Sequence, residues 1–564
     1  MIFQQEKANS LKITKSIKVS ANNILLKNKN EQQVIIENFA KLLRSITIPI
    51  QILCESQEFV VSDWKTKIEN EDYYNFLKKI INENKIVTKE FKIIIRDNDE
   101  DIVDNTLKII KNNLKRCHLE CKDRIEIINK DIFIPYMKSD YIKMGDYYCR
   151  SIYIKDWPHM CSYGWLSDIY NSDKNIDISM FIYPVNDKIE SLNYLDKKLA
   201  LNLSEMILED ETDIDSGAFD EKAISAVRMK DEIYKNQGKF CFMSYYITIK
   251  SKDLMQLNKD YKYIRTILKG LGIEIANTHL RQDDAFLSTR PYGIDYIDKK
   301  YNFTTESLKN FFPFISSNII DKGGILIGEN QLNSSLIFLD PFSYNSALMY
   351  VLGKVGAGKS YVIKLLILRL IFMGVEIDIW DQNGEYERLK QIINLPNLKI
   401  HRYQTIKEYK YQLDKYKRDM NKNIDILKPR FLIVDELWKY INSEDGDYFT
   451  YGLNSIALDG RKCYQGLCVI SQQIEHLYKS DKAMSILRNA SIKTLMHMEH
   501  SEAKLVQKDL NLTNEEVNYL ISARHEGILF AGSRHIQFKA ISNEKEHNVI
   551  TTDPQERKKL KGVG

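Results

Sequence analysis

The sequence contains little of several residues whose abundance would define a protein class. Only 10 of its 564 residues are proline and 23 are glycine, which excludes a collagen-like or low-complexity chain. Its eight cysteines are scattered and lack regular spacing, so we expect a reducing compartment and no disulfide framework. Cys117 and Cys121 are not followed by a second pair at zinc spacing, so they predict no metal centre.

Long hydrophobic runs are also missing. The most apolar stretch, Ile363 to Val375, is interrupted by Lys364 and Arg369 and is too short to span a bilayer. The first residues do not lead from a basic region into an apolar one, so we expect no secretory signal. The sequence therefore predicts a cytoplasmic protein without an integral membrane segment, at most peripheral on the inner face of the cell membrane.

Neither sign of charge dominates. The 81 lysines and arginines nearly balance 77 acidic residues, giving a net charge of +4. This balance gives no global argument for nucleic-acid binding, although it leaves a local basic patch open. Because single cores stop growing beyond about 250–300 residues, a chain of this length predicts several domains.

The first half of the chain predicts α+β structure. Residues 1–140 are poorly determined, with one clear strand at Phe91–Ile95, where alternate apolar side chains share a face. Residues 141–310 predict an α+β docking domain and connector. Strands and helices alternate there in an order that suggests a ferredoxin-like sandwich, at 175–183, 189–206, 241–249, 253–268 and 273–276.

The second half has a different character. In residues 311–552, short apolar runs alternate with helices, which is typical of an α/β domain with a mainly parallel sheet. We expect a RecA-like P-loop nucleotidase here, followed by a basic disordered tail at 553–564.

A phosphate-binding motif lies in this second half. Gly353 to Ser360 reads G-x-x-x-x-G-K-S, between a strand-like run, Leu348–Leu352, and a helix-like run that starts at Tyr361. Chance would give on the order of 0.01 such matches in the chain. The motif in this context therefore predicts a nucleotide site.

The residues of this motif have separate chemical roles. Gly353, Gly356 and Gly358 allow the backbone N–H groups to converge on one anion. Lys359 can reach the β and γ phosphates, and the Ser360 hydroxyl can bind Mg²⁺. We therefore predict ATP and Mg²⁺ as cofactors, with Tyr361 included among the residues that bind the nucleotide.

A carboxylate element follows about 75 residues later. The apolar run Phe431–Val434 ends in Asp435 and Glu436, and ligands of open α/β sheets bind beyond the carboxyl ends of strands. We expect Asp435 to hold Mg²⁺, through water, and Glu436 to polarise the attacking water.

A third element lies near Arg461. The guanidinium of Arg461 is a candidate for stabilising charge on the transferring phosphate, with Lys462 as the alternative. Gln472, at the end of the strand-like run Leu467–Ile470, can orient the γ-phosphate. Surface charges with no role in the site remain the competing interpretation of Arg461 and Lys462.

Together these motifs resemble the conjugative-transfer and type IV secretion ATPases of the VirB-four class (TraC/TrbE-like), in the HerA–FtsK group of RecA-like P-loop ATPases. The resemblance covers roughly residues 145–552. Further segments that fit it in order are Arg150–Pro158, Gly164–Leu166, Ile176–Ser179, Phe312–Phe314, Gly324 with Gly328, Asp340–Phe342, Asp381–Tyr386, Asp435–Trp438, Gly460–Lys462, Ser471–Gln472 and Gly527–Gly532.

Three departures from the family pattern stand out. Gln382 replaces the usual proline, and Ser471 stands where threonine is common. Only about 50 residues separate Tyr386 from Asp435, where family members carry a sizeable helical insertion. Only Lys407–Ile426 can form such helices here, so we expect this accessory subdomain to be largely absent.

The resemblance implies an ATPase that energises a conjugation or secretion apparatus, with membrane-associated channel proteins as partners and a homohexamer as the assembly. DNA or protein is the implied substrate. Two alternatives stay open: a DNA-translocating motor or coupling protein of the same superfamily, and a nucleotide-binding scaffold with little hydrolysis. No basic stripe is evident in the ATPase half, and the intact Lys359, Asp435 and Glu436 argue against the scaffold.

Overall fold

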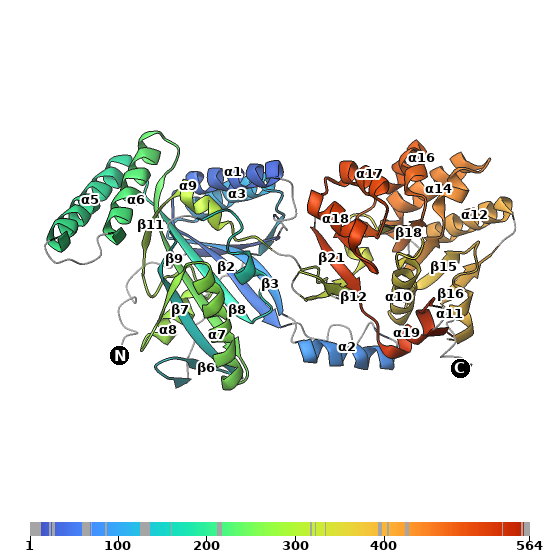
Figure 1. The fold of residues 1–564 in the computed structure, drawn as a ribbon, viewed down its shortest axis with the longest axis horizontal. Helices are drawn as coiled ribbons and strands as arrows, with labels where there is room; N and C mark the ends of the chain where they lie inside the picture. The colour runs from blue at the N-terminus through green and yellow to red at the C-terminus, as the bar shows by residue number, and fades with distance from the viewer. Residues whose placement is uncertain are drawn as a thin grey trace. The chain divides into compact units, whose positions relative to one another are not determined.

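The computed structural model describes residues 13–21, 24, 29–58, 68, 70–84, 87–124, 136–158, 161–210, 217–315, 318–321, 323–332, 334–392, 397–402, 405–422, 428–532, 534–553 and 556–557. The chain forms two compact units, each built around its own sheet (Figure 1). The first unit is Met1–Leu25 with Lys29–Glu58 and Val87–Ser316. The second is Leu26–Asn28 with Phe59–Ile86 and Ser317–Gly564, and we call it the ATPase unit after the activity that its sequence predicts.

The first unit contains an 11-stranded sheet in the order β4-β1-β3-β2-β8-β9-β7-β6-β5, with β10 on β7 and β11 on β9. Every strand pair in it is antiparallel. The strands are β1 Ile13–Val19, β2 Ile50–Glu58, β3 Val87–Asp97, β4 Cys121–Arg124, β5 Tyr136–Met137, β6 Ile142–Met144, β7 Tyr147–Asp156, β8 Ile176–Pro184, β9 Phe240–Ser251, β10 Glu274–Asn277 and β11 Tyr301–Thr304.

This sheet joins two regions that the sequence predicted to be separate. Strand β2, from the predicted region 1–140, pairs with β8, from 141–310, with Ile50 opposite Ile182. Both regions therefore share one core. The helices of this unit are α1 Lys29–Ser45, α3 Glu100–Arg116, α4 Ser167–Tyr170, α5 Lys188–Asp210, α6 Gly217–Tyr234, α7 Leu254–Gly270, α8 Gln282–Ser288 and α9 Thr305–Leu308.

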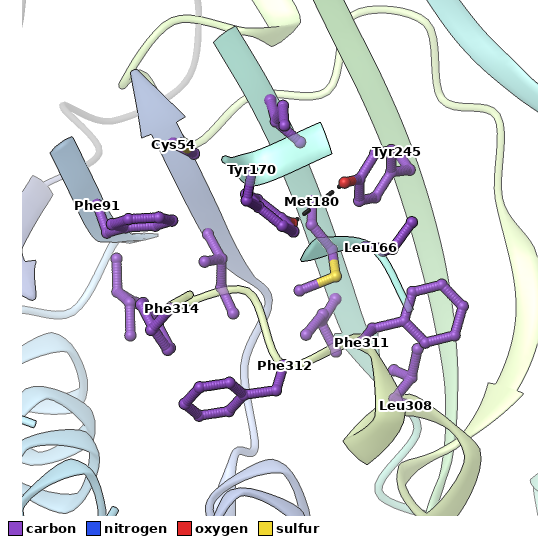
Figure 2. Packing of buried hydrophobic residues seen from close by; sticks show 14 of the residues in the cluster. Cys54, Phe91, Leu166, Tyr170, Met180, Tyr245, Leu308, Phe311, Phe312 and Phe314 are labelled. Carbon is purple, nitrogen blue, oxygen red and sulfur yellow. Dashed lines mark hydrogen bonds between the residues drawn. The ribbon is translucent and has the colours of Figure 1, made fainter. Parts of the chain in front are cut away.

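An aromatic segment at the end of the first unit fills its core (Figure 2). The ring of Phe312 packs edge-on against Phe39 at a centroid distance of 5.2 Å, and that of Phe314 against Phe91 at 5.9 Å. Nearby, the hydroxyl of Tyr245 donates to that of Tyr170 at 3.1 Å. The predicted boundary at residue 310 is therefore too early, because the aromatic segment that follows it belongs to the first unit.

The ATPase unit contains a 10-stranded sheet in the order β13-β12-β21-β20-β19-β14-β18-β17-β15-β16. The run from β19 to β16 is parallel, and the remaining pairs are antiparallel. The strands are β12 Ile325–Asn330, β13 Leu336–Leu339, β14 Leu348–Leu352, β15 Glu376–Trp380, β16 Leu398–His401, β17 Arg430–Val434, β18 Gln465–Ser471, β19 Ile492–Met496, β20 Glu526–Ala531 and β21 Arg534–Ala540.

Helices connect these strands, and the predicted helix at 407–426 is the single one described between β16 and β17. Parallel neighbours require such crossover connections, which is why helices and apolar strands alternate in the sequence. The helices of this unit are α2 Glu71–Asn84, α10 Lys359–Phe372, α11 Glu387–Ile392, α12 Ile406–Lys422, α13 Leu437–Ile441, α14 Gly446–Asp459, α15 Ile474–Tyr478, α16 Asp481–Leu487, α17 His500–Leu510, α18 Asn514–Ser522 and α19 Glu544–Ile550.

Helix α2 is remote in sequence from the rest of the ATPase unit. It lies between β2 and β3 of the first sheet along the chain, yet it packs on the ATPase unit. Its buried side chains, Tyr73, Leu77 and Ile81, contact Leu326 of β12 and a group of apolar neighbours. The apolar side chains of this helix are therefore buried in a core whose other residues lie more than 200 positions later in the sequence.

A fully buried arginine lies beside this helix. Arg369 of α10 donates from Nε and Nη2 to the two carboxylate oxygens of Glu546, at 2.8 and 2.7 Å. It also donates to the backbone oxygens of Leu326 and Ile541. The rings of Tyr73 and Phe76 lie 5.8 Å from its guanidinium carbon. These contacts compensate for taking both charges out of water.

Among the described helices, none combines the length and the apolar composition that crossing a bilayer requires.

The packing of α2 predicts where a core mutation will act. We expect Leu77→Ala to destabilise the ATPase unit by about 2–5 kcal/mol, because it leaves a cavity at a side chain that is 0% exposed. Backbone hydrogen–deuterium exchange should rise in β12, β13 and α10 of the Leu77→Ala variant. Lys78→Ala, at the exposed neighbouring position, is the control and should leave exchange in these elements unchanged. Increased exchange confined to β2 and β3 would contradict this assignment.

Candidate active site

The glycine loop connects β14 to α10 and bends sharply. Gly356 and Gly358 adopt left-handed conformations, with φ of 76° and 94°, which glycine accepts without steric cost. A side chain at Gly353 would lie 2.8 Å from Cβ of Met496, because β14 runs beside β19. The backbone N–H of Lys354 donates to the His497 carbonyl oxygen at 2.9 Å, which ties the loop to the end of β19.

Lys359 lies inside this loop. Its Nζ donates to the carbonyl oxygen of Lys354 at 2.7 Å, and the side chain is nearly buried. Burial lowers the pKa of Lys359 to about 8, although the carboxylates of Glu436 and Asp435 oppose this shift. A buried cation within the glycine loop is placed to bind phosphate oxygens.

Ser360 begins the helix in contact with a carboxylate. Its Oγ donates to Oε2 of Glu385 at 2.7 Å. Glu385 lies in the turn after β15, and the buried carboxylate of Asp381 organises that turn. Asp381 accepts hydrogen bonds from the backbone N–H groups of Gly384, Glu385 and Tyr386 at 2.8, 3.1 and 2.9 Å.

Asp435 lies at the carboxyl end of β17, as the sequence predicted. Its side chain is buried. Burial, together with the negative charges of Glu385 and Glu436, raises the pKa of Asp435 to about 8. A nearby cation would favour the ionised form of Asp435, so these charges suit a site that receives one.

Glu436 follows with a strained backbone. Its φ of 54° lies in the left-handed region, which is unusual for a residue other than glycine. The indole Nε1 of Trp438 donates to its Oε2 at 2.9 Å. The strain and the hydrogen bond together fix the direction of this carboxylate.

Gln472 occupies a central place in the sheet. It follows β18, which lies between β14 and β17, and Ser471 is aligned with Leu352 at the start of the glycine loop. Gln472 therefore follows the strand that lies between the one leading into the glycine loop and the one leading to Asp435.

Tyr361 makes different contacts. Its hydroxyl lies 2.6 Å from Oγ of Ser542 and 3.0 Å from Nδ1 of His547 in α19, so these contacts link α10 to the C-terminal helix. Binding of the nucleotide by Tyr361 stays a prediction.

The role predicted for Arg461 at the transferring phosphate also stays a prediction. The backbone of Gly460–Cys463 forms a short 3-10 helix before β18, but the side chain of Arg461 lies outside the described residues. Lys462, the alternative candidate, is exposed and lies 3.5 Å from the carboxylate of Asp459.

Two side chains of this site were given no role by the sequence reasoning. Asp381–Tyr386 marked the family resemblance, but nothing in that motif indicates that Glu385 accepts from Ser360. Trp438 stands two residues after Glu436, and only the left-handed turn brings its indole back to that carboxylate.

The donor set fits Mg²⁺ together with a nucleotide. In the part of the chain that the structure describes, no three carboxylate, imidazole or thiol side chains converge to hold a metal by themselves. Mg²⁺ is usually held by one or two carboxylates, waters and substrate phosphates. Ser360 and Asp435, beside an anion-binding loop, supply oxygen donors of that kind.

A known protein family matches part of the ATPase unit. Residues 326–525 match the family described as Helicase HerA, central domain. The match confirms, for this segment, the resemblance to the HerA–FtsK group that the sequence predicted. No curated protein matches the sequence.

Several solved structures overlap with part of the chain. VirB4 of Thermoanaerobacter pseudethanolicus is 16% identical over 41% of this chain and 100% of its own, with a TM-score of 0.35. The pCW3 conjugation coupling protein TcpA, solved with ATPgS, is 16% identical over 43% and 72%, with a TM-score of 0.32. The genome packaging NTPase B204 of Sulfolobus turreted icosahedral virus 2 is 17% identical over 36% and 100%, with a TM-score of 0.27.

The hydrogen bond to Glu436 predicts a selective defect. Trp438→Phe keeps an aromatic ring but removes the donor, so kcat should fall while nucleotide affinity stays unchanged. The loss should be smaller than the about 10²–10⁴-fold that removal of a general base costs. Trp157→Phe is a matched control, since this indole N–H lacks a hydrogen-bond partner in the described structure. Equal loss in both variants would exclude a role for Trp438.

Proposed function

We propose that this protein is an ATPase that energises a conjugative DNA-transfer or type IV secretion apparatus by binding and hydrolysing ATP. The observation that carries the proposal is the convergence of a glycine loop and a fixed Glu436 carboxylate at the same edge of a parallel sheet. Nucleotide binding requires only the loop. A carboxylate held in one direction beside it supports activation of water.

The proposed site assigns one task to each group. Lys359 and the loop N–H groups bind phosphate oxygens, whereas Ser360 and Asp435 hold Mg²⁺, which would neutralise charge that develops on the phosphates. Glu436 accepts a proton from the attacking water, and Gln472 orients the γ-phosphate. The HerA-type match of residues 326–525 supports this assignment.

The transport role rests on the wider resemblance. Its motifs extend into the first unit, including Arg150–Pro158 at the end of β7, which we propose docks on membrane-associated channel proteins. We further propose a homohexamer that lies in the cytoplasm and associates peripherally with the inner face of the membrane.

A second candidate function is movement of DNA, which the exposed face of α12 favours. Lys407, Tyr411, Lys415 and Arg418 are exposed at spacings of four, four and three residues, so they share one face. Two of the three acidic groups of this helix contact side chains elsewhere, Asp414 with Tyr448 and Asp419 with Arg430, and the exposed Glu408 accepts from the backbone N–H of Thr405. This face is a local cluster of cations that the sequence analysis did not single out. Cations beside an exposed aromatic ring suit single-stranded nucleic acid.

Measurement of phosphate release tests the proposed activity. Lys359→Ala should abolish ATP-dependent release without changing the circular-dichroism spectrum, whereas Glu436→Gln should bind ATP and turn over slowly. Stimulation by single-stranded DNA would favour the motor over the secretion ATPase. Undiminished release by Glu436→Gln would remove the role assigned to this residue.

Mixing inactive variants tests whether Arg461 acts on the nucleotide of a neighbouring subunit. An arginine supplied in trans contributes about 10³–10⁵-fold to the rate where it acts fully. Arg461→Ala and Lys359→Ala should each be nearly inactive, but mixtures should form some interfaces with an intact loop on one side and an intact arginine on the other. Activity should then return as protein concentration rises. Inactive mixtures that contain mixed oligomers by ultracentrifugation would exclude this role.

A further inference from the structure

The hydroxyl of Ser360, which the proposed function assigns to Mg²⁺, is held by a carboxylate outside the glycine loop and the β17 pair. Oγ of Ser360 donates to Oε2 of Glu385 at 2.7 Å. A hydroxyl at the first turn of a helix often bonds within its own turn, but this one points across to the end of β15. Glu385 therefore contacts the metal-binding part of the site directly.

The position of Glu385 is fixed by its own turn. Asp381, which is 0% exposed, accepts three backbone N–H groups, one of them from Glu385 itself. Gly384 adopts a φ of 74°, and a side chain there would lie 2.8 Å from Nη1 of Arg402. The three N–H groups that Asp381 accepts and the left-handed Gly384 define the shape of this turn, so Glu385 is preorganised towards Ser360.

The fold places Glu385 beside both proposed oxygen donors of the metal. Strand β15 pairs with β17, so the turn that carries Glu385 follows the neighbour of the strand that leads to Asp435. Ser360 joins the same carboxylate to the first turn of α10. Lys359 and Lys364 of α10 are buried lysines that interact with its charge. A carboxylate in this position can act on the donors from outside the metal ligands.

We propose that Glu385 is a positioning residue for the divalent cation that accompanies the nucleotide, acting through Ser360. The inference rests on the proposed function, because it requires a nucleotide–metal complex at this loop. Because the contact of Glu385 is to the Ser360 hydroxyl, we place it outside the protein ligands of the metal. It directs this hydroxyl and, with Mg²⁺ bound, would be placed to accept hydrogen bonds from waters that the ion retains.

The experiment measures nucleotide binding as a function of metal, independently of hydrolysis. The full chain is titrated with a fluorescent ATP analogue at increasing Mg²⁺ and, separately, in EDTA. Mn²⁺ binding in the presence of the analogue is followed by electron paramagnetic resonance. Glu385→Gln keeps the shape of the side chain but removes its charge, whereas Glu385→Asp keeps the charge but shortens its reach.

We expect Glu385→Gln to raise the Mg²⁺ concentration at half-maximal binding about tenfold or more, as removal of partners outside the metal ligands typically does. Binding in EDTA should stay unchanged or improve, because a negative charge near the phosphates is lost. Glu385→Asp should recover part of the Mg²⁺ dependence. Glu387→Gln, in the first turn of α11, is the matched control and should behave like the wild type.

Two results would overturn the inference. One is an unchanged Mg²⁺ dependence in Glu385→Gln, and the other is an equal loss of binding with and without metal, as a purely structural role requires. Failure of the wild-type chain to bind the analogue at all would instead count against the proposed function, so the two failures are distinguishable.

Discussion

Carboxyl groups crowded where little water reaches them constrain the nucleotide end of the ATPase sheet. Asp435 and Glu436 follow one strand and Glu385 follows its neighbour, and their charges oppose the burial that lowers the pKa of Lys359. Negative charges on these groups would repel one another, and this repulsion contributes to the raised pKa of Asp435. The strained turn at Glu436 and the N–H groups around Asp381 hold these side chains in place despite that repulsion. A site of this kind is prepared for a cation and for the phosphates that bring it.

The sheet explains how these groups meet. Parallel strands present their carboxyl ends at one edge, so motifs far apart in sequence become neighbours without any direct local signal. The glycine loop follows β14 and Asp435 follows β17, while β18 between them places Gln472 in the gap. This arrangement could be predicted from the sequence, because each motif follows a short apolar run. Parallel strands in register then place the ends of these runs, and so the motifs, at the same edge of the sheet.

Other features depend on contacts that no local pattern encodes. The apolar face of α2 is visible in the sequence, but its partner, β12, lies more than 200 residues away, so its place in the ATPase unit could not be predicted. Phe312 and Phe314 were placed in the ATPase domain because they precede its strands, yet the aromatic core of the first unit takes them. The bond between Ser360 and Glu385 depends on the direction of a turn, which composition does not fix.

The route of the chain through α2 has a consequence for how the protein can be divided. Beyond Lys29, the chain passes from the first unit to the ATPase unit after Glu58, returns after Ile86 and crosses again after Ser316. Cutting the backbone once, after Ser316, would leave helix α2 covalently joined to the strands of the first sheet. A fragment that starts at Ser317 would also lack the helix that covers Leu326, Phe338 and Phe372. The ATPase unit therefore could not be exchanged by recombination as one uninterrupted stretch of gene.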